Sequence, residues 1–530
     1  MSSQSNHPSR AEAIAVPAAV IPATRVRAVL MRLAPALSGG LIGATFLDFN
    51  LHLLAWVAFA PLLWALHHAR DRREAVVLAA IAGVITNILG FYWLVYTINV
   101  FGGFPYPVAA FFFACLTAYS SLQFVLLALA FRRTGWGPLG IAPALVWTAL
   151  EFLYPNLFPW RMAHSQYHVV PLIQIGEITG PYGLSFVVVW ASAAVAMSVS
   201  ESGRRRLAPV AAVAVAALAL YTYGLQRIPA VEAAVGASPL VNIALVQGNI
   251  GIKEKGDERY FEVNVDRYRE LTGRAQDRVA LAVWPETVVQ EWVPASATAL
   301  SGDDAPFPGL RTSLIYGGLA FQRTGVHEAD EFNSAFLIDG SGSVLGRYDK
   351  QILMPFGEYL PFVSLIPGIK KISPRTGGFT AGRDSRTFAV PGVGQVGPLI
   401  CFEDISASIP RAMTNAGAEM LIAMANDAWY GASAAPYEHQ ALALWRAIEN
   451  RRYLLRVNNS GVTGVIDPLG RVVAELPIFT SDALVVAVHP LRLASVYTRI
   501  GDVFGWSAVL VCVALLIRGR GQQGRAKLRA

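Results

Sequence analysis

Apolar and polar positions divide the chain into two kinds of sequence. Seven long apolar runs precede a polar-patterned block of about 250 residues, and one more run follows it. A transmembrane helix needs about 20 mostly apolar residues. The pattern therefore predicts an α-helical membrane bundle of about eight transmembrane helices, at residues 29–49, 51–68, 75–98, 106–131, 138–154, 181–200, 207–225 and 502–518.

Within the polar block, short β-like runs alternate with helical stretches. Helices are predicted at 260–275 and 437–452, and hairpin turns at Asp339-Gly340 and 467–470. This mixture is typical of an α/β layered domain with a mixed sheet. The predicted strands are 241–247, 280–284, 313–319, 334–338, 396–400, 421–425, 454–458 and 463–466.

Basic residues gather between the apolar runs and orient the predicted bundle. With seven helices before the α/β block, every basic cluster falls on one side, which the positive-inside rule makes cytoplasmic. The α/β block then lies outside the cytoplasm. The clusters are Arg25, Arg27 and Arg32; Arg70, Arg72 and Arg73; Arg132 and Arg133; Arg204, Arg205 and Arg206; and Arg518, Arg520, Arg525, Lys527 and Arg529.

These patterns predict five segments and one unusual loop. The loop at 155–180 is rich in aromatic residues, which favours an interfacial segment, either re-entrant or lying on the membrane surface. The predicted segments are a disordered cytoplasmic tail at 1–27, a transmembrane domain of about seven helices at 28–229, an α/β domain at 230–495, a C-terminal transmembrane helix at 496–519 and a basic cytoplasmic tail at 520–530.

Composition changes this picture little. Hydrophobic residues make up 54% of the chain and charged residues 15%, below the quarter or so of soluble proteins. The net charge of +7 does not indicate nucleic-acid binding, because the arginines flank apolar runs. Only Cys401 of the three cysteines lies in the polar block, so no disulfide is predicted there. No zinc-type Cys/His spacing is present, and neither a metal nor a cofactor is expected.

Three residues of the polar block suggest chemistry. Glu286 follows the strand-like run 281–285, Lys350 follows 345–349 and Cys401 follows 396–400. A carboxylate, an ammonium and a thiol are the groups that acyl transfer through a thioester requires. A thiol at the start of a turn or helix beside a cation is expected to have a lowered pKa. Taken singly, the three residues also fit a solvated glutamate, a surface lysine and a buried structural cysteine.

The three segments resemble a known superfamily. Trp284-Pro-Glu286, Asp349-Lys350 with Pro355-Phe-Gly-Glu358, and Ile400-Cys-Phe-Glu-Asp404 occur in this order, with the triad residues 64 and 51 positions apart. This resembles the nitrilase, or carbon–nitrogen hydrolase, superfamily, and the resemblance covers about 240–490. It implies an αββα sandwich with a Glu–Lys–Cys catalytic triad, which gives Glu286, Lys350 and Cys401 their expected roles.

A nitrilase-like domain between seven preceding apolar runs and one following run is similar to the apolipoprotein N-acyltransferase family of bacterial inner membranes. The resemblance implies transfer of a phospholipid acyl chain, through a cysteine thioester, to the α-amino group of the diacylglyceryl-cysteine at an apolipoprotein N-terminus. It implies a multi-pass inner-membrane protein whose catalytic domain is periplasmic. Glu358 and Glu403 match supporting carboxylates of the family.

Two positions depart from the family pattern, and one loop suggests lipid contact. Relatives often have tyrosine where this chain has Phe402, and many have tryptophan in the loop that reads Asn249-Ile-Gly-Ile-Lys-Glu-Lys-Gly256 here. The apolar, proline-punctuated loop after Lys350 would be costly to expose to water but could dip into the acyl region. Its candidate lipid-contacting residues are Met354, Phe356, Tyr359 and Phe362.

Two other classes of protein fit parts of the pattern. A membrane-tethered amide hydrolase would use the same triad with water as acceptor. A transporter or receptor would only bind ligand in its outer domain, but few ionisable residues interrupt the apolar runs beyond Asp48 and Glu151. The Gly392–Gly397 run matches a dinucleotide fingerprint, yet it precedes a strand instead of opening a helix. His439 is expected in the wall of the site.

Overall fold

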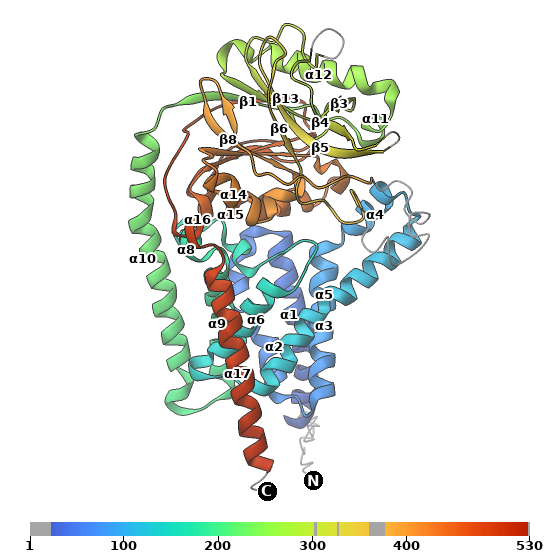
Figure 1. Ribbon diagram of the computed structural model, residues 1–530. Helices are drawn as coiled ribbons and strands as arrows, with labels where there is room; N and C mark the ends of the chain where they lie inside the picture. The colour runs from blue at the N-terminus through green and yellow to red at the C-terminus, as the bar shows by residue number, and fades with distance from the viewer. Residues whose placement is uncertain (1–22, 301–304, 326–327, 360–376, 528–530) are drawn as a thin grey trace, which may run out of the picture.

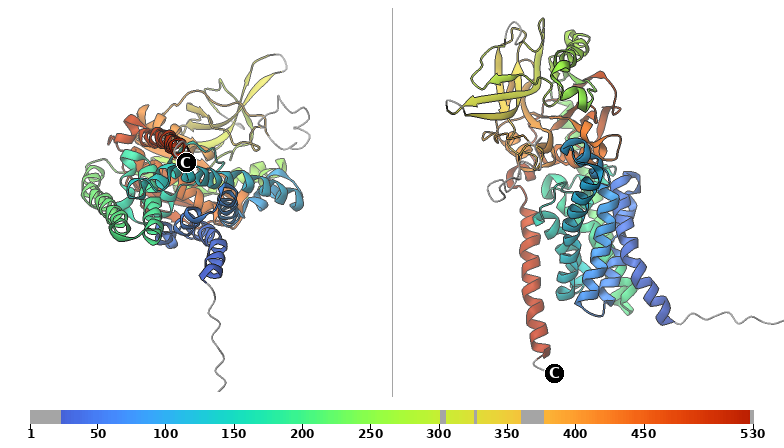
Figure 2. Two further views of the ribbon diagram at one scale, coloured as in Figure 1. Left: turned by 90° about the horizontal axis from the view of Figure 1, so that it is seen from below. Right: turned by 90° about the vertical axis from the view of Figure 1, so that its right-hand side faces the viewer.

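The computed structural model describes residues 23–300, 305–325, 328–359 and 377–527. The protein has two structurally distinct parts, one stacked on the other (Figure 1). A bundle of helices forms one part, and two β-sheets with covering helices form the other (Figure 1). Seen from the side, the sheets sit on one end of the bundle (Figure 2). Both ends of the chain lie at the opposite end of the bundle (Figure 1).

Each predicted transmembrane run coincides with an apolar helix. In the described part of the chain, six helices are long and apolar enough to cross a membrane, and two more apolar helices are shorter, at 138–153 and 503–519. The bundle consists of α1 (Ala23–Leu47), η1 (Phe49–Trp56) with α2 (Ala60–His68), α3 (Arg72–Phe91), α5 (Tyr106–Thr134), α6 (Ile141–Leu153), α9 (Tyr182–Ser200), α10 (Ala208–Gly236) and α17 (Val503–Lys527).

Several helix ends differ from the prediction. The third helix ends at Phe91, and the rest of its predicted run forms a separate helix, α4 (Leu94–Gly102). The helix α10 continues to Gly236, beyond the predicted end at 225. The helix α1 begins at Ala23, inside the predicted disordered tail, whose residues 1–22 lie outside the described part of the chain.

The basic loops meet at one end of the bundle. Arg132 at the end of α5 donates a hydrogen bond of 2.8 Å to the carbonyl of Ala69, between α2 and α3. Gly519 of α17 lies so close to α5 that an added Cβ would stand 2.6 Å from the Arg133 carbonyl oxygen. These contacts place three of the predicted basic clusters together, at the end of the bundle that also holds both chain termini (Figure 1).

The other part is a four-layer α/β sandwich. One sheet has the order β13-β1-β2-β4-β5-β6, with β3 paired to β4, and the second has the order β12-β11-β10-β9-β8-β7. The strands of the first sheet are β1 (Val241–Gln247), β2 (Leu281–Val283), β3 (Trp292–Pro294), β4 (Ser313–Arg323), β5 (Ala329–Ile338), β6 (Val344–Asp349) and β13 (Asp482–Val488). Those of the second are β7 (Phe388–Val390), β8 (Gly394–Ile400), β9 (Met420–Ala425), β10 (Tyr453–Asn458), β11 (Thr463–Ile466) and β12 (Val472–Leu476).

Most predicted strands occur in the sandwich within a few residues of their expected limits, and both predicted hairpins form, between β5 and β6 and between β11 and β12. Strands β3, β7, β12 and β13 lie outside the predicted set, and β6 corresponds to the strand-like run 345–349. The glycine run 392–397 lies in the hairpin from β7 into β8, so it does not form a nucleotide-binding turn.

Helices cover the outer faces of the two sheets. The helix α12 (Phe261–Gly273) packs on the first sheet through Tyr268 and Leu271. The helices α14 (Ser408–Asn415) and α15 (Ala435–Asn450) cover the second sheet on the side of the bundle (Figure 1). Nearly every residue of α15 is buried, because the sheet covers one of its faces and the bundle the other.

The aromatic loop between α6 and α9 packs inside the protein, and its predicted place at the membrane interface stays a prediction. It folds into η3 (Met162–Gln166), α7 (Val170–Ile173) and α8 (Gly176–Thr179), and its polar side chains His164, Gln174 and Glu177 are buried. A Cβ on Gly176 would stand 2.9 Å from the Trp445 ring of α15. The loop is therefore interior packing between the bundle and the sandwich.

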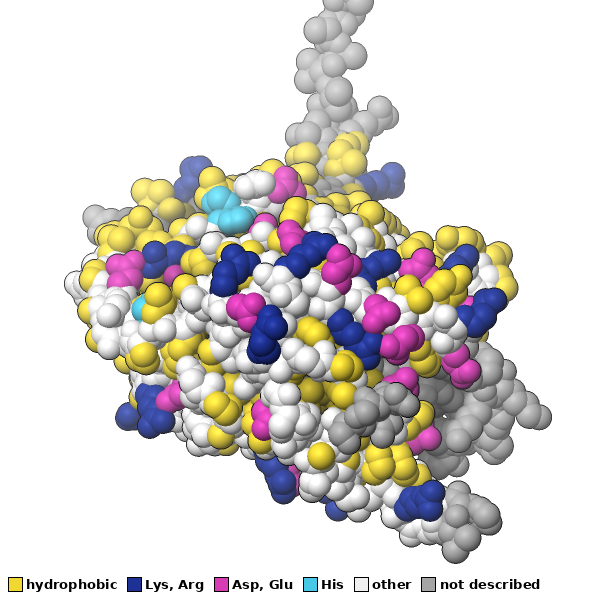
Figure 3. All heavy atoms as spheres, turned by 90° about the horizontal axis from the view of Figure 1, so that it is seen from above, with side chains coloured by type: hydrophobic (Ala, Val, Ile, Leu, Met, Phe, Trp, Pro, Cys, Tyr) yellow, Lys and Arg dark blue, Asp and Glu magenta, His cyan; other side chains and the backbone are white. Residues whose placement is uncertain are grey.

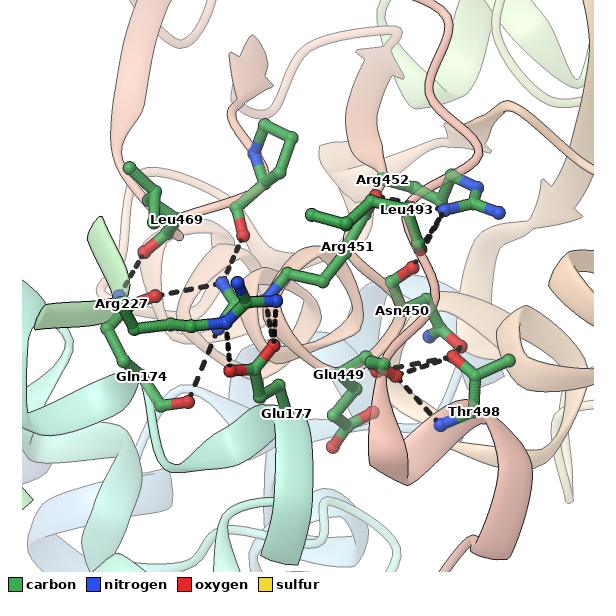
Figure 4. Close-up of polar contacts among 12 residues, drawn as sticks. Gln174, Glu177, Arg227, Glu449, Asn450, Arg451, Arg452, Leu469, Leu493 and Thr498 are labelled. Carbon is green, nitrogen blue, oxygen red and sulfur yellow. Dashed lines mark hydrogen bonds and ion pairs between the residues drawn. The ribbon is translucent and has the colours of Figure 1, made fainter. Parts of the chain in front are cut away.

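Charged contacts hold the sandwich to the bundle at this junction. Glu177 of α8 accepts hydrogen bonds from Arg451, which follows α15, and from Arg227 of α10, at 2.7 and 2.5 Å (Figure 4). Tyr223 of α10 donates to the same carboxylate. The far face of the sandwich, in contrast, carries interspersed acidic and basic side chains, as an ordinary hydrated surface does (Figure 3).

Candidate active site

The ends of β2 and β6 in the first sheet and of β8 in the second bring the predicted site residues together. Glu286 lies three positions after the end of β2, Lys350 follows β6 directly and Cys401 follows β8 directly. The Lys350 Nζ lies 3.2 Å from Glu286 Oε1, across 64 positions of sequence. The Cys401 thiol interacts electrostatically with both groups. The carboxylate, ammonium and thiol therefore share one site.

A second carboxylate completes the surroundings of Lys350. Glu358 lies 2.8 Å from the ammonium through Oε2, and that oxygen also accepts a 2.7 Å hydrogen bond from the Met354 amide. The amide nitrogen of Asn333 of β5 donates to both Glu286 and Glu358 at 2.8 Å, so it bridges the two carboxylates. Burial alone would lower the pKa of Lys350, but Glu286 and Glu358 raise it well above its usual value. Lys350 is therefore a permanent cation.

Cys401 occupies a strained turn. Its φ of 50° is in the left-handed region, which residues with a side chain rarely adopt, and it opens η8 (Cys401–Ile405). Its side chain is half-buried. Burial and the nearby Glu286 raise the thiol pKa well above its usual value, although Lys350 opposes them. The expected lowering of the thiol pKa is therefore wrong, and the resting thiol is protonated and needs a base.

Glu403 lies under this turn and interacts electrostatically with Lys350. Its carboxylate accepts hydrogen bonds from the Ile400 amide at 2.8 Å, the Gln351 amide at 2.6 Å and the Tyr348 hydroxyl at 2.8 Å. Burial raises its pKa to about 6, against these hydrogen bonds. Glu403 thus ties the segment after Lys350 to the turn that presents Cys401.

The predicted lipid-contacting loop is only partly in view. Phe356 is 57% exposed and Tyr359 is 38% exposed, whereas Met354 is half-buried. Phe362 lies outside the described residues. A Cβ on Gly357 would stand 2.8 Å from the Phe101 ring of α4, which itself lies 4.6 Å from the Trp429 ring. The helix α4 of the bundle part therefore borders the site.

His439 forms part of the wall, as its position predicted, and its partners were not foreseen. Its Nε2 lies 2.7 Å from Asp404 and its Nδ1 lies 2.9 Å from Asp427. Burial lowers the pKa of His439, but the two carboxylates outweigh burial and raise that pKa to about 9. The imidazolium locks η8 to the segment after β9.

Lys255 is a site residue that the sequence did not single out. Its ammonium donates a 2.7 Å hydrogen bond to the backbone carbonyl of Glu286. It also interacts electrostatically with the Glu286 carboxylate and with Cys401. The missing tryptophan had marked its loop as unusual, but nothing in the spacing of residues indicated that this lysine reaches the triad.

Aromatic side chains of the bundle close the membrane side of the site. The Phe402 ring lies 6.3 Å from that of Phe158, between α6 and η3, and the Trp93 ring lies 5.0 Å from that of Tyr430. A narrow cavity follows between the bundle and the sandwich, lined by Phe91, Trp93, Phe158, Trp160, Tyr430, Ala435, Glu438, His439 and Leu442.

A four-layer sandwich with a carboxylate, a lysine and a cysteine at its strand ends, mounted on apolar helices, defines a membrane enzyme of the carbon–nitrogen hydrolase superfamily. The carbon–nitrogen hydrolase family model matches residues 242–498. The model of the apolipoprotein N-acyltransferase N-terminal domain matches residues 38–194.

Curated relatives match over nearly the whole chain. The apolipoprotein N-acyltransferase of Geobacter metallireducens is 34% identical over 89% of this chain and 92% of its own length. That of Bradyrhizobium diazoefficiens is 29% identical over 91% of this chain and 93% of its own length. Among solved structures, Nit3 of Saccharomyces cerevisiae, a nitrilase-superfamily member, covers 47% of this chain at 17% identity, with a TM-score of 0.36.

The chain belongs to the apolipoprotein N-acyltransferase family. It is accordingly an acyltransferase of lipoprotein maturation and a bacterial membrane protein, with a nitrilase-type domain and a helical membrane part.

Proposed function

We propose that the chain takes a fatty acyl group from a membrane phospholipid, holds it as a thioester on Cys401, and passes it to the α-amino group of the diacylglyceryl-cysteine of an apolipoprotein. The contact between Phe402 and Phe158 carries this proposal, because it joins the nucleophile's turn to the helical bundle. A thiol at the end of membrane-spanning helices is placed near the ester groups of lipids. For a water-soluble amide substrate, a position next to the bundle would offer no advantage in binding.

The first half-reaction begins with the protonated thiol. Glu286 accepts the proton of Cys401, and the thiolate attacks the ester carbonyl carbon of the phospholipid. Lys350, held between Glu286 and Glu358, faces the oxyanion that develops and stabilises it. When the ester bond breaks, Glu286 returns the proton to the departing alkoxide. The products are the acyl–Cys401 thioester and a lysophospholipid.

The second half-reaction uses the same groups in the same order. The neutral amine of the acceptor attacks the thioester carbonyl carbon, and Lys350 again faces the oxyanion. Glu286 takes the proton that the amine loses on forming the amide bond and returns it to the sulfur as the carbon–sulfur bond breaks. The site is then restored. Because one carboxylate serves each transfer, its loss affects both half-reactions.

Mass spectrometry of the purified protein tests the donor and the nucleophile together. After incubation with phospholipid, Cys401 is expected to gain the mass of one acyl group, and a diacylated peptide with a free N-terminus is expected to remove it. Cys401→Ala should bind no acyl group. An adduct that persists with the peptide would contradict transfer, and release of free fatty acid without peptide would favour the hydrolase alternative.

We further propose that the α/β domain is periplasmic and that the bundle spans the inner membrane. The gathering of basic loops at the opposite end supports this orientation. In intact spheroplasts, a membrane-impermeant maleimide should label a cysteine placed at exposed Glu270 of α12. It should label one placed at exposed Arg73 only after permeabilisation. The reverse pattern would contradict the orientation.

The loop after Lys350 remains a proposed lipid contact. Phe356 exposes 57% of its surface beside the site, an unfavourable position for a large ring in water. Phe356→Ser is expected to slow acylation of Cys401 by phospholipid. Tyr437→Ser, at a similarly exposed aromatic ring on α15, is the control. Equal acylation rates in the wild type and Phe356→Ser would remove the lipid contact.

A further inference from the structure

Lys255 is the last residue of a short helix, α11 (Ile252–Lys255), which follows β1 at the mouth of the site. Its side chain is half-buried, whereas its neighbour Lys253 on the same helix is exposed. The ammonium is fixed by a 2.7 Å hydrogen bond to the carbonyl of Glu286 and interacts electrostatically with Cys401. The protein thus holds a second cation beside its nucleophile.

The two lysines of the site differ in their counter-ions. Lys350 lies within 3.2 Å of the carboxylates of Glu286 and Glu358. Among the described residues, no carboxylate oxygen comes within 4.0 Å of the Lys255 ammonium, the limit for an ion pair. The hydrogen bond of Lys255 goes to an uncharged backbone carbonyl. An ammonium carries three N–H donors, so two donors of Lys255 are available to a ligand.

A cation withdrawn from water without a counter-ion is unfavourable. Burial accordingly lowers the pKa of Lys255 to about 8, although Glu286 and Cys401 act to raise it. An anionic ligand in hydrogen-bonding contact would remove this penalty. The site is therefore suited to a substrate that brings a negative charge close to its scissile bond.

We propose that Lys255 binds the phosphodiester of the phospholipid donor, so that it is a specificity-determining residue of the first half-reaction. This inference rests on the proposed phospholipid donor. The phosphodiester is the permanent anion that a glycerophospholipid always carries, and it is only a few bonds from the ester that Cys401 attacks. Lys350 is already neutralised by two carboxylates and faces the oxyanion, which leaves the phosphate to Lys255.

The test compares two acyl donors in the same detergent micelles: dipalmitoyl phosphatidylglycerol and dipalmitoylglycerol, which lacks phosphate. The readout is the rate of acyl adduct formation on Cys401. Lys255→Gln is expected to lower the rate with the phospholipid by about 10- to 100-fold more than it lowers the rate with dipalmitoylglycerol. Transfer from a preformed thioester to a diacylated peptide should fall no further than the rate with dipalmitoylglycerol, which excludes a folding defect as the cause of the donor effect.

Matched variants sharpen the comparison. Lys253→Gln should behave as the wild type with both donors, and Lys255→Arg, which keeps the charge, should keep most of the preference for the phospholipid. Inorganic phosphate distinguishes the source of the anion. If it competes in the wild type and not in Lys255→Gln, the site takes phosphate in general; if it does not compete while the donor preference persists, the site takes lipid-borne phosphate.

An equal loss of rate with both donors in Lys255→Gln would overturn the inference, because the ammonium would then act on the reaction itself. No loss with either donor would overturn it as well. Both results leave acylation of the wild type intact. A wild type that forms no adduct from phospholipid would instead contradict the proposed function.

Discussion

Two buried ion clusters, one in the active site and one at the junction of the two parts, have opposite compositions. The proposed catalytic cluster, Glu286, Lys350 and Glu358, places two carboxylates around one ammonium. The junction cluster, Glu177, Arg227 and Arg451, places two guanidinium groups around one carboxylate (Figure 4). Each cluster carries one charge in excess, negative in the first and positive in the second.

The excess charges serve different ends. In the catalytic cluster the extra carboxylate belongs to Glu286, which raises the pKa of Cys401 and is placed to take its proton. In the junction cluster both cations are arginines, which stay protonated at any physiological pH. Arg451 also donates 2.8 Å hydrogen bonds to the Gln174 side chain and the Pro468 carbonyl. A cluster that we propose to move protons therefore contrasts with one that only fixes positions.

The largest effect is expected from Lys350→Met. Two buried carboxylates without a cation cannot both stay ionised, so one takes up a proton and the base is lost together with the oxyanion partner. Acylation of Cys401, followed by mass spectrometry, should fall by about 10³-fold. Lys253→Met, at an exposed lysine, is the control. A rate within tenfold of the wild type would break the assignment of the catalytic cluster.

Arg451→Met should instead act on stability. It leaves Glu177 with one cation and removes the partners of Gln174 and Pro468, at a cost of about 3 kcal/mol. The thermal midpoint in detergent should fall, while folded protein still forms the acyl adduct within several-fold of the wild-type rate. Arg259→Met, at an exposed ion pair, should leave the midpoint unchanged. A large loss of acylation without a change in midpoint would show that the junction cluster, like the active-site cluster, acts on the reaction.

The His439 imidazolium lies between two carboxylates, as the Lys350 ammonium does. Unlike Lys350, it can lose its proton in an accessible pH range. Its folded pKa of about 9 exceeds the usual 6.5, so its stabilisation is complete below pH 6.5 and is lost as the pH rises through 9. The loss should amount to about 2–3 kcal/mol. Thermal midpoints between pH 7 and pH 9.5 measure it.

His439→Gln should flatten this pH dependence. Lys255 acts in the opposite direction, because its lowered pKa makes stability rise with pH from about 8 upward. The difference between wild type and variant therefore isolates the histidine. Equal slopes for the two proteins would show that the carboxylates do not hold a proton on His439.

The smallest effect is expected from Arg227→Gln. The Arg227 side chain is 25% exposed, so water can replace part of its contact with Glu177, and Arg451 and Tyr223 remain. The loss of stability should stay below about 1 kcal/mol, measured by the thermal midpoint in detergent. A loss as large as that of Arg451→Met would show that α10 bears as much of the junction as α15 does.

The sequence predicted those features that follow from periodicity and from position at strand ends. Glu286, Lys350 and Cys401 each follow an apolar run that forms a strand, and the ends of these three strands meet at the site. Glu358 follows Lys350 by eight residues, so the chain itself keeps it near. The apolar helices were equally visible, because their length and composition are local properties.

Features that depend on distant segments were not predictable in the same way. The pKa of Cys401 is governed by its burial and by Glu286, neither of which local sequence reports. Glu177 and Arg451 are 274 positions apart, and neither belongs to a motif. Lys255 reads as one of two loop lysines, and only the folding of α11 against Glu286 separates it from Lys253.

The burial of α15 on both of its faces has a consequence for dissecting the enzyme. One continuous hydrophobic core runs from Leu62 and Val188 in the bundle through Trp445 and Ile448 to Val457 in the second sheet. Excising the sandwich as a soluble fragment would bare this helix to solvent and invite aggregation. The helices of the bundle therefore form part of the support of the sandwich. A truncation that removes them is not expected to give a folded, soluble domain.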